Sequence, residues 1–75
     1  MAMTVELVTR RGCHLCDEAL DLLRALAVEP VQRDVDGDPE LSRLYDFRLP
    51  VVLVDGPVVG DGRLSREGLA RALGR

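Results

Sequence analysis

The amino-acid sequence predicts one small α/β domain with the element order β-α-β-α-β-β-α, in which a four-stranded mixed sheet has helices on both faces. Short β-type apolar runs alternate with stretches whose apolar residues recur at the helical period, which is typical of β-α-β units. An Asp-Gly pair between the last two runs is a hairpin signal, so those strands are expected to be antiparallel. A chain of 75 residues has room for a single domain, residues 1–75.

The first half of the chain predicts a strand, a helix and a second strand. Residues 5–8 form a short β-type run, and a polar loop closed by Gly12 follows it. Apolar residues then recur at the helical period and predict a helix over residues 13–27. Pro30 stops this helix, and residues 31–35 alternate as in a second strand. Because a helix separates the two strands, they are expected to run parallel.

The second half predicts a short helix, a hairpin and a last helix. Asp38 followed by Pro39 is typical of an N-cap with proline at the first helical position. Ser65 is expected to cap the last helix. The other predicted elements are a helix over residues 39–45, a buried strand over 51–54, an edge strand over 57–59 and a loop over 60–62.

Composition excludes several classes of function. All ten basic residues are Arg, against thirteen acids, so the net charge is −3 and no mechanism can use a catalytic lysine. An acidic chain with only two aromatic residues is not expected to bind nucleic acid. Those two, Tyr45 and Phe47, are expected to pack in the core or at its edge. No apolar run is long enough for a membrane span and no signal peptide is evident, so a cytoplasmic protein is expected.

The pair Cys13 and Cys16 stands where the first strand gives way to the first helix. The cytoplasm is reducing, which argues against a purely structural disulfide. A helix N-terminus favours the thiolate form of cysteine, and the thiolate is the nucleophile. We therefore expect Cys13 to attack a disulfide and the inward-facing Cys16 to resolve the mixed disulfide. Arg10, Arg11 and His14 lie beside the pair and are either sources of positive potential or ordinary solvated side chains.

Two stretches of sequence resemble the glutaredoxin-like branch of the thioredoxin superfamily. One is Gly-Cys-His-Leu-Cys-Asp-Glu over residues 12–18, and the other is Leu-Pro-Val-Val over residues 49–52. The resemblance covers almost the whole chain and implies the thioredoxin-like fold. It also implies that Pro50 is the cis-proline that faces the cysteines. The backbone of Leu49 would then pair with a substrate strand across Cys13.

The resemblance also suggests partners and an electron donor. Typical glutaredoxins carry Cys-Pro-Tyr-Cys, Thr-Val-Pro and a Gly-Gly-Cys-Asp-Asp type stretch that helps to hold glutathione. Here His14 and Leu15 separate the cysteines, and Gly-Asp-Gly-Arg occupies residues 60–63. Only part of a glutathione site is therefore matched. Expected substrates are disulfide-containing proteins or small thiols, with glutathione or a thioredoxin-reductase-like enzyme as donor and no tightly bound cofactor.

The candidate substrate-binding residues are Leu49, Pro50, Arg11, His14 and Asp61, and the protein is expected to act as a monomer. Asp61 is either a contact for an amine of a peptide-like substrate or a plain loop residue.

The main alternatives are a non-catalytic thioredoxin-like binding module and a metal-binding or metallochaperone domain. Structural zinc requires four ligands, and this chain offers only Cys13, Cys16 and His14, which lies between the cysteines. Copper-type metallochaperones resemble this chain in length and motif, but their order is βαββαβ and ends on a strand. The predicted helix at the C-terminal end therefore favours the redox interpretation, and no metal ligand is assigned.

Overall fold

A computed structural model describes residues 3–75 and confirms the predicted order of elements. The sheet has the strand order β2-β1-β3-β4, in which β1 runs parallel to β2 and antiparallel to β3. Strand β4 runs antiparallel to β3. The elements are β1 (Val5–Thr9), α1 (His14–Ala25), β2 (Val31–Asp34), the 3₁₀ turn η1 (Val35–Gly37), α2 (Pro39–Tyr45), β3 (Val51–Val54), β4 (Val58–Asp61) and α3 (Arg66–Ala72).

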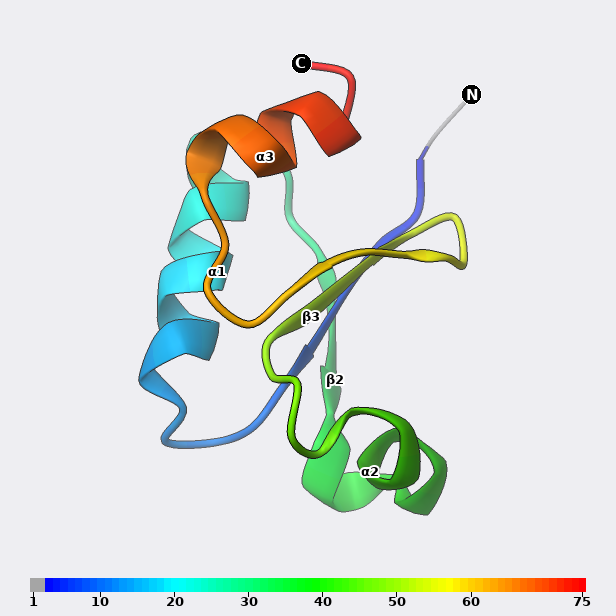
Figure 1. The fold of residues 1–75 in the computed structure, drawn as a ribbon. Helices are drawn as coiled ribbons and strands as arrows, with labels where there is room; N and C mark the ends of the chain where they lie inside the picture. Colours follow the sequence, from blue (N-terminus) through cyan, green and yellow to red (C-terminus); the bar gives the residue numbers. More distant parts are fainter. Residues whose placement is uncertain (1–2) are drawn as a thin grey trace.

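One face of the sheet holds the main core. Helices α1 and α3 both lie on this face (Figure 1). Side chains in a strand alternate between the two faces, so every second residue of β1 and β3 points toward these helices. The buried residues of this core are Val5, Leu7, Ala19, Leu23, Val52, Val54, Leu69 and Leu73. The face of α1 that carries Cys16 is thereby held against the sheet.

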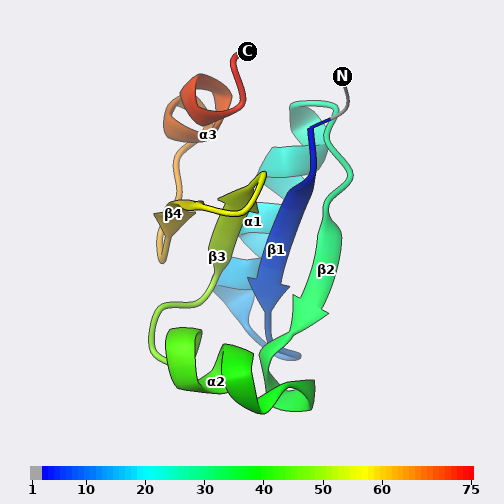
Figure 2. The ribbon, with the colours of Figure 1, turned by 90° about the vertical axis from the view of Figure 1, so that its right-hand side faces the viewer.

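The opposite face is covered at one end by a helix. Helix α2 lies across the end of the sheet where β1 and β2 finish and β3 begins (Figure 2). There Leu41 and Tyr45 pack against the buried side chains of Val8, Val35 and Val51. All four residues of β2 are exposed, as expected for a strand at the edge of the sheet.

Several element boundaries differ from the prediction. Helix α1 begins at His14 with Cys13 as its N-cap, and it ends at Ala25. Ala27 adopts a left-handed conformation (φ 62°), and the Val28 N–H donates to the Leu23 carbonyl at 2.9 Å, a common way for a helix to end. Strand β4 extends to Asp61, so the predicted loop over residues 60–62 is partly strand, because the β3–β4 pairing continues to that position.

The expected packing in the core or at its edge is confirmed for Tyr45, which is half-buried, and wrong for Phe47. Tyr45 lies in the last turn of α2 and faces the cluster around Val8 and Val51. Phe47 comes two residues after the helix ends, and its side chain is 97% exposed.

Candidate active site

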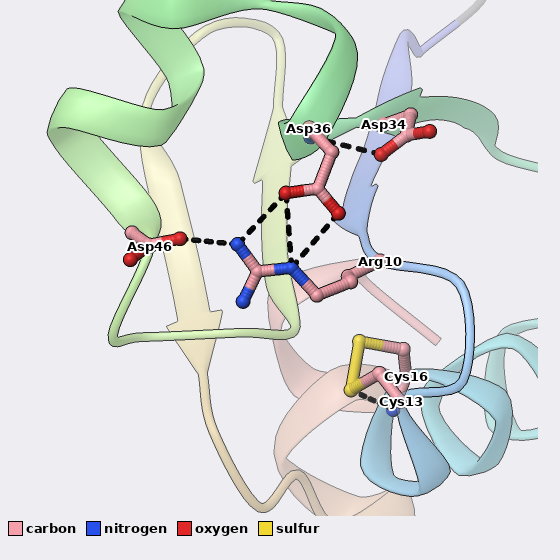
Figure 3. Close-up of polar contacts among 6 residues, drawn as sticks. All are labelled: Arg10, Cys13, Cys16, Asp34, Asp36 and Asp46. Carbon is pink, nitrogen blue, oxygen red and sulfur yellow. Dashed lines mark hydrogen bonds and ion pairs between the residues drawn. A yellow bond between two sulfur atoms is a disulfide. The ribbon is translucent and has the colours of Figure 1, made fainter.

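The two cysteines are joined as a disulfide at the N-terminus of α1 (Figure 3). Cys13 is the N-cap residue, and its Sγ accepts a hydrogen bond from the Cys16 N–H at 3.2 Å. The Cα atoms lie 5.2 Å apart, as one helical turn requires. Gly12 turns the chain with a left-handed backbone (φ 79°), and the Cys13 N–H donates to the Arg10 carbonyl at 3.2 Å.

Burial distinguishes the two sulfurs. Cys16 is 1% exposed, on the buried face of α1 that also carries Ala19 and Leu23. Cys13 is half-buried at the helix end. Cys13 is therefore the cysteine that an incoming molecule can reach, and Cys16 is protected beneath it.

Arg10 connects this loop with the opposite side of the site. Its Nε lies 3.0 Å from Asp36 Oδ2 in η1, and its Nη2 pairs with Asp46, the residue that caps the end of α2 (Figure 3). The hydrogen bonds that Arg10 donates to Asp36, and then those it donates to Asp46, raise the pKa of Arg10 above its ordinary value. Asp34 accepts the Asp36 N–H at 2.9 Å and holds η1 in place. Two carboxylates thus offset the charge of Arg10, and these ion pairs link the loop before Cys13 to η1 and to the end of α2.

The segment that leads into β3 lies next to this loop. Val51 pairs with Val8, so the chain entering β3 and the chain leaving β1 meet at the same end of the sheet. The Leu49–Pro50 peptide bond is cis, and Pro50 is buried. The Gly62 N–H lies within hydrogen-bonding distance of the Pro50 carbonyl, at 2.9 Å. Within residues 3–75, the main chain of Leu49 makes no hydrogen bond of its own.

The remaining predicted site residues lie on two sides of the cysteine pair. Arg11 is exposed in the loop before Cys13. His14 is 89% exposed, and its Nε2 lies 3.2 Å from Glu18 Oε2, one turn along α1. Asp61 lies at the end of β4, where its Oδ2 accepts a hydrogen bond from Arg48 Nε at 2.7 Å. The structure thus places Arg11 and His14 beside Cys13 and gives the Asp61 carboxylate a partner within the chain.

No sequence pattern indicated a role for Arg48, or for Asp36 and Asp46 as the partners of Arg10. These partners lie 26 and 36 residues from Arg10 in the chain. No local pattern links them, because only the pairing of β1 with β2 and β3 brings them together.

Two features are absent from the described part of the chain. Among residues 3–75, no group of three or more His, Cys, Asp or Glu side chains is arranged to hold a metal ion. No helix in the same part of the chain is long and apolar enough to cross a membrane.

A β2-β1-β3-β4 sheet with a Cys-X-X-Cys pair at the start of α1 defines the thioredoxin-like class of proteins. Within that class, the chain belongs to the glutaredoxin-like domain family (DUF836), whose model matches residues 4–74. The predicted family and fold are therefore confirmed.

Known proteins similar to this chain span a range of identities. The uncharacterized protein Rv0508 of Mycobacterium tuberculosis is 39% identical over 61 residues, which make up 69% of this chain and 63% of that protein. This chain therefore spans less than two thirds of that relative. The X-ray structure of target XcR50 from X. campestris is 30% identical, with a TM-score of 0.84 over 95% of this chain and 96% of that one. Glutaredoxin 1 from Francisella tularensis shares the fold at 20% identity, with a TM-score of 0.73 over 99% of this chain and 100% of that one.

Proposed function

We propose that the protein is a thiol–disulfide oxidoreductase that reduces disulfides, or mixed disulfides, of proteins or small thiols. The observation that carries the proposal is the asymmetry of the cysteine pair. Cys13 caps a helix N-terminus and is accessible, whereas Cys16 lies one turn further on and is buried. The Cys16 N–H that reaches Cys13 Sγ, together with the positive end of the helix dipole, favours the thiolate at Cys13 in the reduced protein.

The reaction proceeds in two exchanges. The Cys13 thiolate attacks one sulfur of the substrate disulfide, so a Cys13–substrate mixed disulfide forms and the other substrate sulfur leaves as a thiolate. The Cys16 thiolate then attacks Cys13 Sγ, which closes the Cys13–Cys16 disulfide and releases the second substrate thiolate. The substrate gains two electrons and the protein dithiol loses two. Two electrons and two protons from a donor dithiol, or from two monothiols, restore the starting state.

Substrate positioning is assigned to the segment opposite Cys13. The unpaired main chain of Leu49 offers hydrogen-bonding groups to an extended substrate, and the buried Pro50 fixes where that segment lies. Arg11 and His14, which are exposed close to Cys13 in the chain, are assigned as further substrate contacts. The proposed donor is glutathione or a thioredoxin-reductase-like enzyme, and the proposed compartment is the cytoplasm, where dithiols are kept reduced.

The variant Cys16→Ser tests the proposal directly. Reduced Cys16→Ser protein is mixed with glutathione disulfide and analysed by mass spectrometry. We expect a stable adduct of one glutathionyl group on Cys13, because the attacking thiol remains and the resolving thiol is gone.

The matched control is Cys13→Ser, which should stay unmodified because Cys16 is buried. Wild-type protein should end as the internal disulfide. If Cys16→Ser forms no adduct and the wild-type thiols stay free across a graded glutathione redox buffer, a non-catalytic binding module replaces the oxidoreductase.

A further inference from the structure

Phe47 is an aromatic side chain that the fold leaves in water. It is 97% exposed, and Leu44, three residues earlier on α2, is 42% exposed. Neither side chain belongs to the main core or to the cluster packed around Val8 and Val51. Exposed aromatic rings are a frequent feature of protein–protein contacts, where they act as anchors.

Side-chain contacts of the residues before and after Phe47 hold the turn that carries it. Before it, Asp46 pairs with Arg10. After it, the Arg48 guanidinium lies 5.6 Å from the centre of the Tyr45 ring, and Arg48 Nε donates to Asp61 at 2.7 Å. The main chain is held as well, because the Arg48 N–H donates to the Tyr45 carbonyl at 2.9 Å. The ring is thus presented from an ordered turn, so a partner that covers it has little backbone to immobilise.

This turn borders the redox site. Phe47 precedes Leu49 by two residues, and the pairing of Val8 with Val51 brings the chain entering β3 alongside the chain that leads to Cys13. Both segments lie at the same end of the sheet, beside α2 (Figures 1 and 2). A molecule whose disulfide reaches Cys13 and whose main chain pairs with Leu49 therefore extends toward Phe47.

The charges beside the ring point to the chemistry of the partner. Asp46 and Arg48 flank Phe47, and each is already paired within the chain, with Arg10 and with Asp61. The immediate surroundings of the ring are therefore close to electrically balanced, and an apolar, uncharged surface complements them. Glutathione carries no large apolar side chain that could cover a phenyl ring.

We propose that Phe47, supported by Leu44, is the aromatic anchor that selects protein disulfides flanked by apolar side chains. This inference rests on the proposed function and names its substrate class. Phe47 is a specificity-determining residue here, and it takes no part in the sulfur exchange.

Two cyclic disulfide peptides test the inference, one with leucines beside the cysteines and the other with serines. Reduced protein is mixed with each peptide, and the second-order rate constant of reduction is measured in a single turnover, so no donor is needed. Phe47→Ser should lower the rate constant for the leucine peptide about tenfold, equivalent to about 1.4 kcal/mol. The serine peptide and hydroxyethyl disulfide should change less than about twofold, because neither covers the ring.

Val31→Ser is the matched control, since Val31 is 57% exposed on the edge strand β2 and should leave all three rates unchanged. Phe47→Leu should recover part of the rate for the leucine peptide. Urea denaturation should give Phe47→Ser the stability of the wild type, because the exposed ring contributes little packing.

The outcomes distinguish a failure of the Phe47 inference from a failure of the proposed oxidoreductase activity. If the wild-type protein reduces none of the three disulfides, the oxidoreductase proposal fails. If it reduces them and Phe47→Ser slows all three equally, or none, the oxidoreductase stands and the anchor is refuted.

Discussion

Gly12→Ala is expected to disturb both the stability and the reactivity of the protein. Gly12 has φ 79°, and a Cβ built there meets no atom within 4 Å, so crowding adds nothing to the effect. The cost comes from the left-handed backbone alone and is about 1–2 kcal/mol for a residue with a Cβ. At a urea slope of about 1 kcal/mol per molar for a small domain, the midpoint should fall by about 1–2 M.

The loop can avoid part of this cost only by changing its backbone, and Cys13 would then move. Its Sγ would leave the Cys16 N–H that lies 3.2 Å away. Urea denaturation and the single-turnover rate with hydroxyethyl disulfide are therefore measured together. We expect stability, rate or both to fall.

Gly37→Ala is the matched control for this experiment. Gly37 has no left-handed backbone, and an added Cβ again meets nothing within 4 Å. Alanine should therefore leave the rate unchanged. It should stabilise the protein by about 0.4–1 kcal/mol, because it lowers the conformational entropy of the unfolded chain. A Gly12→Ala protein with wild-type stability and rate would refute the role assigned to this turn.

Three further predictions concern the core, acid stability and thiol access. Leu23→Ala should lower the free energy of unfolding by about 2–5 kcal/mol in urea denaturation, because Leu23 is fully buried between α1 and the sheet. Hydrogen bonds from Arg24 lower the pKa of Glu29 below its ordinary 4.5. The Arg24–Glu29 pair therefore stabilises the fold fully above pH 4.5, and this contribution is lost as the pH falls through the lowered pKa. Stability measured from pH 6 to about 2 should therefore drop less steeply in Glu29→Gln than in the wild type. Brief iodoacetamide treatment of the reduced protein should label Cys13 before Cys16, and peptide mapping that finds equal labelling would contradict the burial of Cys16.

Sequence determined most of the local architecture because the signals act over three or four residues. Asp38 accepts hydrogen bonds from the first turn of α2, and Ser65 accepts from Gly68 in α3, as their N-cap positions predicted. Cys13 is likewise the N-cap of α1, where its side chain accepts a hydrogen bond from the Cys16 N–H. The periodicity of apolar residues likewise placed the sheet strands and the buried face of α1, and with it Cys16. The roles proposed for Cys13 and Cys16 follow from that placement and stay predictions until the adduct experiment is done.

Tertiary structure alone decided which charges and rings surround the cysteines. The partners of Arg10 are brought to it by strand register across 26 and 36 residues. Arg10 was open as a source of positive potential or as an ordinary solvated charge, and these two carboxylates offset its charge. Asp61, a candidate contact for a substrate amine, is brought to Arg48 and pairs with it. The direction in which the chain leaves α2 packs the half-buried Tyr45 against the Val8 and Val51 cluster and exposes Phe47. Hydrophobicity by itself cannot distinguish two aromatic residues so close in sequence, because burial depends on where the rest of the chain lies.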